Sequence, residues 1–271
     1  MKKLIIGNGK VARIIRDKNT IVVPRQGCDI RDEQSIEKVI QRTQPDILIN
    51  CAAKTNLEYC QENKIEAFNV NTQGTINCLL ACEKHRIKFV HISSGCLFDG
   101  NHFIADEMTV ASPSVWYTHT KNWADEYIKN YGYKSYLILR PRQLISAVPH
   151  PTNMLTKFSN FEMIEAIDED NSVTCIEDFA DMINHLIAQD ATGIFNCSNT
   201  GTLTPYEIAS RIRDTISPSL VVKKTSYKNL LQFLPNRRVN TVLSNHKLIS
   251  TGYTPRHASE ALEWCLKNYG K

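Results

Sequence analysis

The chain has 271 residues, of which 42% are hydrophobic and 22% charged, a composition typical of globular proteins. This length allows one substantial core with a smaller appended lobe and excludes two large independent domains. The formal net charge is only +4, and the lysines and arginines are scattered among acidic residues, which argues against a nucleic-acid-binding or membrane-binding surface.

Short apolar runs and helical patterns alternate over the first 140 residues. The chain opens with an apolar run at 3–6, a glycine-rich turn, and then Val11, Ile14 and Ile15 at helical spacing. Further apolar runs predict strands at 20–23, 46–50, 88–93 and 135–139, and helical periodicity predicts helices at 34–42, 64–84 and 116–130. Because parallel strands are joined by helical crossovers, this alternation predicts an α/β fold with a Rossmann-like, doubly wound parallel sheet.

The pattern becomes less regular after about residue 141. Pro149-His150-Pro151 leads into an irregular polar segment, and helical periodicity returns near 176–188, 205–215 and 257–268. We therefore expect a core over residues 1–145, and a smaller C-terminal α/β lobe over 146–271 that is interleaved with the last strands of the core.

The glycine-rich turn fits the dinucleotide-binding pattern G-x-G-x-x-[G/A]. Gly7 and Gly9 would let the backbone approach a pyrophosphate, and the start of the helix would offer free N–H groups to it. Ordinary turns also match this pattern, so its position between a predicted strand and a predicted helix supports the interpretation. The residues expected to form this site are Gly7, Asn8, Gly9, Lys10, Val11 and Ala12.

The end of the second predicted strand bears on the choice of cofactor. NAD-preferring sites carry Asp or Glu there to bind the ribose hydroxyls, whereas this strand ends in Val23-Pro24-Arg25. Arg25 could pair with a 2′-phosphate, which favours NADPH over NADH, although an ordinary exposed arginine is the competing interpretation. Asp29 and Ile30 are spaced to meet the adenine. The other expected cofactor contacts are Cys51, Ala52, Ala53, Lys54 and Asn71.

Tyr117 and Lys121 are four residues apart and share one face of a predicted helix. A phenol exchanges protons slowly at neutral pH, and a neighbouring cation lowers its pKa toward the working range. Lys121 would also hold the nicotinamide ribose. Ser94 follows the strand predicted at 88–93, where its hydroxyl can reach the same carbonyl oxygen as Tyr117. These three residues predict a carbonyl-reducing site.

With these residues in this order, the chain resembles the dTDP-4-dehydrorhamnose reductase family of extended short-chain reductases over nearly its whole length. The resemblance is closer still to the nucleotide-sugar 3,5-epimerase/4-reductases of rhamnose synthesis in plants and giant viruses. It implies reduction of the 4-keto group of a nucleotide-linked deoxysugar, with Arg142, Asn153 and Arg238 as substrate contacts; a surface ion pair is the alternative role for either arginine. The motifs that carry the resemblance are His91-Ile-Ser-Ser-Gly-Cys-Leu-Phe-Asp-Gly100, Arg140-Pro-Arg142, Asn153-Met-Leu-Thr-Lys157, Gly193-Ile-Phe-Asn196, and Arg238 with Asn240 and Leu243.

The bifunctional enzymes that the chain resembles use a cysteine two residues after the catalytic serine or threonine to protonate the carbons next to the ketone. Cys96 occupies this position, and residues two apart in an extended segment share a face, so Ser94 and Cys96 could address one sugar. Lys157 is the expected base if burial or a nearby cation lowers its pKa. His150 is the competing base, and a small apolar role is the alternative for Cys96.

The predicted reaction converts UDP- or dTDP-4-keto-6-deoxyglucose to the corresponding L-rhamnose nucleotide. The alternatives are a 4-reductase without epimerase activity and a non-catalytic, NADP-binding regulatory subunit. The nine cysteines form no CxxC pair and no zinc-binding spacing, so we expect reduced thiols, no metal and a cytoplasmic location. The apolar run that begins at Leu4 stops at Gly7, too short for a signal or membrane segment. A homodimer is the candidate assembly.

Overall fold

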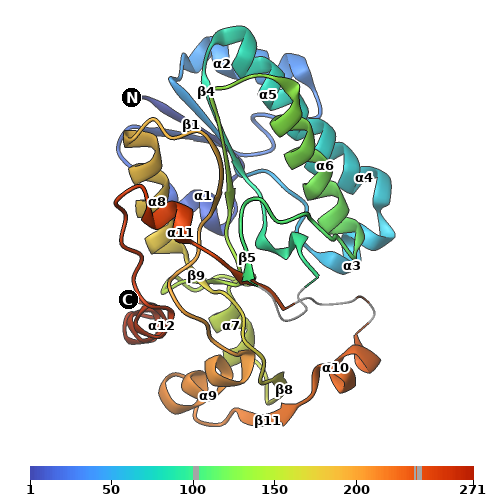
Figure 1. The fold of residues 1–271 in the computed structure, drawn as a ribbon, viewed down its shortest axis with the longest axis vertical. Coiled ribbons are helices and arrows are strands. Elements are labelled where there is room, and N and C mark those ends of the chain that lie inside the picture. The colour runs from blue at the N-terminus through green and yellow to red at the C-terminus, as the bar shows by residue number, and fades with distance from the viewer. Residues whose placement is uncertain (100–103, 235, 237–239) are drawn as a thin grey trace.

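The computed structural model describes residues 1–99, 104–234, 236 and 240–271. Its centre is a six-stranded sheet in the order β2-β1-β3-β4-β6-β10, and every neighbouring pair of strands is parallel (Figure 1). This sheet confirms the predicted Rossmann-like α/β fold. The six strands are β1 (Lys3–Ile6), β2 (Thr20–Val23), β3 (Ile47–Asn50), β4 (Lys88–Ile92), β6 (Tyr136–Arg140) and β10 (Gly193–Asn196).

Helices cover both faces of the sheet. Because side chains alternate between the faces of a strand, Leu4 and Ile6 belong to one hydrophobic cluster and Ile5 belongs to the other. Figure 1 shows the two helical layers on opposite sides of the sheet. The helices are α1 (Lys10–Ile15) and α8 (Ile176–Ala188) on one face, and α2 (Glu33–Thr43), α5 (Gly74–His85) and α6 (Trp116–Tyr131) on the other.

The edge strand β10 was not predicted as a strand, because Gly193-Ile-Phe-Asn196 is short and stands between polar segments. It pairs with β6, with Ile194 opposite Ile138 and Phe195 opposite Leu139. Phe195 and Phe179 of α8 are buried in the same cluster as Ile5. Residues of the C-terminal half therefore complete the core sheet.

The single helix expected at 64–84 is wrong in one respect, because the segment is divided. Helix α4 (Lys64–Phe68) passes into a π-helical turn, η1 (Asn69–Gln73), before α5 begins; α3 (Leu57–Glu62) precedes α4. Asn71 in the wide turn is fully buried, and its amide bonds the backbone of Lys54 and the hydroxyl of Thr120. The inward-facing asparagine gives a polar reason for the π-helical turn at this place.

The smaller lobe lies beyond the carboxyl edge of the sheet, in the lower half of Figure 1. Its buried centre includes Leu155, Ile208, Ile212 and Leu262. Helices were predicted at 205–215 and 257–268, and both are present. The small parallel sheet that residues 163–167 and 221–225 form in the lobe was not predicted. The lobe and its connections comprise η2 (Gly95–Leu97), β5 (Ile104–Ala105), β7 (Leu144–Ile145), α7 (Met154–Ser159), β8 (Met163–Ile167), β9 (Thr174–Cys175), α9 (Pro205–Thr215), β11 (Val221–Thr225), α10 (Tyr227–Phe233), β12 (Val242–Leu243), α11 (His246–Ile249) and α12 (Ala258–Lys267).

The strand order reverses at β1, since the chain places β2 on one side of it and β3 on the other. In open α/β sheets, ligands bind where the carboxyl ends of strands meet such a reversal. The ends of β1 and β3 therefore mark the place to look for a site. Within the described ranges, no helix is both long and apolar enough to cross a membrane.

Candidate active site

The glycine-rich turn lies where β1 and β3 end side by side. Gly7 has a φ of +109°, and a Cβ placed on it would lie 2.9 Å from both the Ala52 nitrogen and the Cys51 carbonyl carbon. Gly9 precedes α1, and no side chain caps the helix there. A Cβ on Gly9 would meet no atom within 4 Å. The turn thus packs on the end of β3 and leaves the first N–H groups of α1 available, as a pyrophosphate site requires.

Three cationic side chains gather beyond the end of β2. Arg25, whose side chain is 55% exposed, lies 3.8 Å from both Asp29 and Glu66, and Lys54 Nζ lies 3.0 Å from Glu66. A hydrogen bond from Arg31 lowers the pKa of Asp29 to about 2. Two carboxylates thereby hold three cations together. Sequence reasoning pointed to Arg25, Asp29 and Lys54 but missed Arg31 and Glu66, which no motif marks.

Two of the expected cofactor contacts face the protein interior. Ile30 is buried against Gly74, where an added Cβ would lie 2.6 Å from Ile30 Cγ1. Asn71 accepts a hydrogen bond of 2.7 Å from the Lys54 backbone and donates one of 3.0 Å to Thr120. Both side chains are engaged inside the protein, and a direct contact with a cofactor stays a prediction.

Ser94 and Tyr117 meet at the carboxyl edge of the sheet. Ser94 follows β4 and accepts a hydrogen bond of 3.1 Å from the Cys96 backbone, and its hydroxyl lies close enough to the Tyr117 phenol to lower the pKa of that phenol. Tyr117 lies in the first turn of α6 and is 9% exposed. Burial raises the pKa of Tyr117 above its usual value, and Cys96 adds to the increase. The phenol is therefore protonated at neutral pH, the form that donates a proton.

Lys121 lies one turn further along α6 and is fully buried. Its ammonium nitrogen lies 3.0 Å from His91 Nε2 and 2.9 Å from the Ile92 carbonyl oxygen. Burial lowers the pKa of Lys121 to about 8, although Asp125 opposes this change. The expected lowering of the Tyr117 pKa by Lys121 is not found: Ser94 is the group that lowers this pKa, and the effect of burial is larger.

A buried ionic network lies behind Lys121. Asp125, one turn after Lys121, accepts hydrogen bonds from Ser93 at 2.9 Å and from Arg140 Nε at 3.1 Å. His91 Nε2 is 3.9 Å from the other oxygen of Asp125. Periodicity treats His91 and Arg140 as interruptions of apolar strands, so sequence reasoning assigned them no role. Their burial on neighbouring strands is the signal that it lacked.

Cys96 lies beside a second buried arginine. Arg142 Nη1 is 2.8 Å from Cys96 Sγ, and Arg142 Nε donates a hydrogen bond of 2.9 Å to Asn171 Oδ1. Asn171 in turn donates a hydrogen bond of 2.8 Å to Asn240. The chain of amides fixes the guanidinium against the thiol, two residues beyond Ser94. Asn171 was not among the predicted site residues.

The sequence profile of the RmlD substrate binding domain family matches residues 5–271. The chain belongs to this family. A bifunctional dTDP-4-dehydrorhamnose 3,5-epimerase/dTDP-4-dehydrorhamnose reductase of Arabidopsis thaliana is 28% identical over 231 residues, which cover 81% of this chain and 75% of that protein. Protein L780 of Acanthamoeba polyphaga mimivirus is 27% identical over 270 residues, which cover 92% of each chain.

Solved structures share the fold of this chain. The dTDP-4-dehydrorhamnose reductase of Bacillus anthracis in complex with NADP superposes with a TM-score of 0.88 at 23% identity, covering 97% of this chain and 98% of that one. The L780 UDP-rhamnose synthase of the mimivirus superposes with a TM-score of 0.84 at 23% identity, covering 98% and 99%. Both show the fold that this RmlD-family chain adopts.

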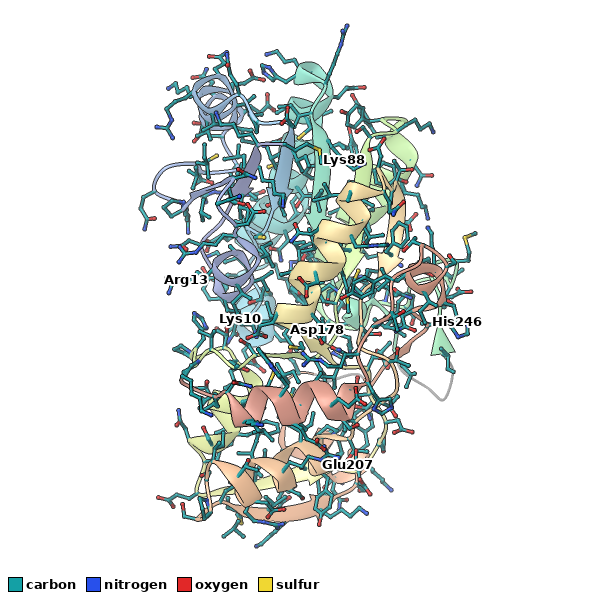
Figure 2. The ribbon with its side chains drawn as sticks, turned by 90° about the vertical axis from the view of Figure 1, so that its left-hand side faces the viewer. Lys10, Arg13, Lys88, Asp178, Glu207 and His246 are labelled. Carbon is teal, nitrogen blue, oxygen red and sulfur yellow. The ribbon has the colours of Figure 1, made fainter. Side chains whose placement is uncertain are left out.

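The two candidate bases of this RmlD-family protein lie near the glycine-rich turn. Lys157 on α7 is exposed, so of the two conditions given for its role as the base, burial is not met. The cation near Lys157 is Lys10. Burial lowers the pKa of Lys10 to about 8, and the charge of Lys157 adds to this decrease. Lys10 Nζ donates a hydrogen bond of 2.7 Å to the Thr152 carbonyl, and Figure 2 shows Lys10 at the end of α1 that faces the lobe. Burial, followed by Lys10 and Arg13, lowers the pKa of His150.

The Asn153 side chain forms hydrogen bonds with the backbone around it. Its Oδ1 accepts a hydrogen bond from Leu155 N at the start of α7, and its Nδ2 donates to the carbonyls of Ser146 and Val148 at 2.8 and 3.0 Å. These bonds fix the loop that carries His150 and the helix that carries Lys157. A substrate contact from Asn153 stays a prediction, and Arg238 lies outside the described residues.

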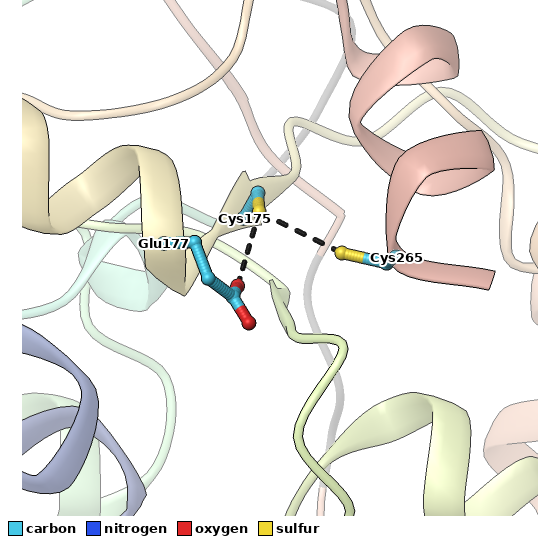
Figure 3. A group of neighbouring side chains, drawn as sticks. All are labelled: Cys175, Glu177 and Cys265. Atoms are coloured by element: carbon cyan, nitrogen blue, oxygen red, sulfur yellow. Dashed lines mark hydrogen bonds between the residues drawn. The ribbon is translucent and has the colours of Figure 1, made fainter. Parts of the chain in front are cut away.

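A cysteine cluster lies apart from this site, between β9, the start of α8 and α12 (Figure 3). Among the described residues, Cys175, Glu177 and Cys265 are the one group whose metal-binding atoms lie within 4.8 Å of one another. The two sulfurs are 3.6 Å apart, and Cys175 donates to Glu177 at 3.2 Å. Arg256 Nη2 lies 3.7 Å from the Cys175 sulfur and disfavours a cation there. All nine cysteines are free.

Proposed function

We propose that the protein is an NADPH-dependent nucleotide-sugar 4-reductase of the dTDP-4-dehydrorhamnose reductase type that also carries 3,5-epimerase activity. The observation that carries the proposal is the placement of Ser94 beside Tyr117, close enough to lower the pKa of the phenol, with Lys121 one helical turn away. All three lie at the carboxyl edge of the sheet. A pure binding role would not require this set.

The strand reversal is the proposed place for NADPH. The Gly7 turn and the small residues after β3 give a pyrophosphate room to approach the backbone, and the cluster of Arg25, Arg31 and Lys54 offers charge to a 2′-phosphate. When bound, NADPH supplies the hydride for reduction of the 4-keto group. NADH, which lacks the 2′-phosphate, would leave Arg25 without this partner.

The proton for O4 comes from Tyr117 in this proposal. Its phenol is held in the protonated state by burial, and the neighbouring Ser94 hydroxyl would orient the carbonyl oxygen between them. The two hydrogen bonds also stabilise negative charge on O4, whether it develops during hydride transfer or in an enolate. Lys121 provides positive charge one turn after Tyr117 on the helix. The third N–H of its ammonium, beyond those at His91 and the Ile92 carbonyl, is proposed to bind the ribose.

Cys96 is the proposed acid for the epimerase steps. A thiol that protonates a carbon next to the ketone becomes a thiolate, and the Arg142 guanidinium, 2.8 Å from the sulfur, is placed to stabilise this charge. Lys157 is the proposed base, with His150 as the competitor, and its exposure means that the substrate itself must cover it. Arg238 is the proposed contact for the diphosphate.

The relatives define the substrates to test. One is named for dTDP-linked sugars and another for UDP-rhamnose synthesis, so UDP- and dTDP-4-keto-6-deoxyglucose are the two candidates. The protein would be incubated with NADPH and each ketosugar in deuterated water, and the product read by NMR. We expect rhamnose carrying deuterium at C3 and C5. The Cys96→Ala variant should lose this product and still reduce a pre-epimerised ketosugar.

Other outcomes select the alternatives. Oxidation of NADPH only with a pre-epimerised ketosugar would reduce the proposal to a 4-reductase. Absence of turnover with every ketosugar, together with retained NADPH binding in a Tyr117→Phe variant, would favour a regulatory subunit. A homodimer and a cytoplasmic location also stay proposals, and light scattering of the purified protein tests the first.

A further inference from the structure

The protonation state of Lys121 is linked to the tautomer of the neighbouring His91 ring. Its nitrogen is enclosed by the Ile92 carbonyl and by His91 Nε2, so the protonation of the lysine and the hydrogen position on the ring depend on each other. An ammonium must donate to a bare Nε2, whereas a neutral amine can accept from an Nε2–H. The hydrogen position follows from what lies on the other side of the ring.

Asn50 occupies that side, and its amide orientation is fixed by two neighbours. The Ala52 backbone N–H donates to Asn50 Oδ1 at 3.1 Å, which identifies the oxygen. Thr75 donates its hydroxyl proton to the Asn71 carbonyl at 2.8 Å and so accepts from Asn50 Nδ2 at 3.1 Å, which identifies the nitrogen. It is therefore Nδ2, a donor, that lies 3.5 Å from His91 Nδ1.

A donor facing Nδ1 favours the His91 tautomer with the proton on Nε2, and this tautomer suits a neutral Lys121 amine. If Lys121 is an ammonium, His91 must carry its proton on Nδ1, against the Asn50 amide. The ring itself stays neutral in both states, because burial holds the pKa of His91 well below its usual value. Asp125 acts in the opposite sense, since its carboxylate, whose Oδ1 has no hydrogen-bond partner among the described residues, attracts a positive charge on Lys121.

We propose that His91 is a positioning residue whose tautomer changes with the protonation of Lys121 and sets the pH range in which Lys121 is an ammonium. As the pair loses a proton, Lys121 passes one proton from Nζ to His91 Nε2, and the proton on Nδ1 is released to water. The inference rests on the proposed function only in treating Lys121 as part of the reducing site. Its chemistry depends on the buried contacts alone.

The other groups around Lys121 do not replace His91 in this role. Cys51 at the end of β3 is a thiol whose pKa burial raises to about 12, so it is neutral. Tyr117 on the same helix is protonated. Arg140 on β6 is engaged with Asp125 and acts on Lys121 through that carboxylate. Only His91, among the titratable groups described around Lys121, can change its hydrogen position without changing its charge.

The first test reads the ring directly. Long-range ¹H–¹⁵N NMR of the full-length protein, with the His91 signals assigned by their loss in a His91→Met variant, reports which ring nitrogen carries the proton. We expect Nδ1–H at pH 7 and Nε2–H at pH 9.5, with one midpoint. The same tautomer at both pH values overturns the proposal, and this result does not depend on any enzymatic activity.

The second test uses the pH profile of kcat/KM for ketosugar reduction. His91→Met removes the group that accepts a hydrogen bond from the Lys121 ammonium, so the ammonium is less stable. The decline of kcat/KM at high pH should therefore begin at a pH lower by about one to two units. His91→Gln, whose amide can rotate to suit either state of Lys121, should restore the limb. His185→Met is the control, because His185 is a partly buried histidine that is also hydrogen-bonded, to Thr251, but lies on α8.

The two tests separate the possible failures. A lower rate in His91→Met with an unmoved limb would indicate a structural role and overturn the proposal. If the wild-type protein reduces no ketosugar, the proposed function fails, and the NMR titration still decides the role of His91.

Discussion

Replacing Arg140 by methionine would remove the counter-charge of a fully buried carboxylate. Asp125 Oδ2 receives Arg140 Nε and Nη2, both at 3.1 Å, and Asp125 is completely buried. Leaving such a charge without its partner costs about 3–5 kcal/mol. We expect the free energy of unfolding of Arg140→Met at pH 7.5, measured by urea titration, to fall by about this amount.

The loss should depend on pH. Burial raises the pKa of Asp125 in the folded protein, and Arg140 is the first group that counters this. Without Arg140 the folded-state pKa rises further above the unfolded value. A carboxyl with a raised folded-state pKa destabilises the fold once the pH has risen through that pKa. The difference in unfolding free energy between Arg140→Met and wild type should therefore shrink from pH 7.5 to pH 5.

An exposed pair provides the control for this measurement. Arg213 lies 2.7 Å from Asp214, but their side chains are 40% and 58% exposed, so Arg213→Met should leave the unfolding free energy nearly unchanged at either pH. Adding Asp125→Asn to Arg140→Met removes the buried charge and should recover much of the stability. Equal losses of stability in Arg140→Met and Arg213→Met, or a loss in Arg140→Met that does not vary with pH, would refute the reasoning about Asp125.

Two further variants test the cofactor crevice. Gly7→Ala should lower the unfolding free energy by more than Gly132→Ala and should weaken NADPH binding in a fluorescence titration. The two glycines have φ values of +109° and +108°, but only at Gly7 would the new Cβ meet backbone, 2.9 Å away. The conformational cost alone is about 1–2 kcal/mol, and equal losses at both positions would contradict a close approach of the turn to β3. Arg25→Ala should raise the KM for NADPH at least tenfold and leave that for NADH unchanged; parallel changes for both would show that Arg25 does not read the 2′-phosphate.

Local sequence signals were sufficient for the core and for the order of the catalytic residues. Five strands of the central sheet lie within one residue of their predicted bounds because each is an apolar run with clear ends. Ser94 and Tyr117 could be paired from sequence because a strand end and a helix start are recognisable locally. Their proximity is the consequence in three dimensions.

The remainder depends on partners that are distant in sequence. The π-helical turn follows from Asn71 reaching Lys54 and Thr120, and neither contact changes the helical period of 64–84. His91 and Arg140 are polar residues in apolar strands, and only the folded chain brings them together around Asp125. The small sheet of the lobe was missed because β11 is mostly exposed and carries two lysines.

The position of β10 at the edge of the sheet also constrains how the chain folds. The last core strand begins at residue 193, after β7, α7, β8 and β9 of the lobe have been made. During synthesis, one edge of β6 therefore stays unpaired until more than 50 further residues have been added. Unpaired edges promote aggregation. The long sequence separation between β6 and β10 predicts slow folding, and a fragment ending at residue 145 should need a chaperone to stay in solution.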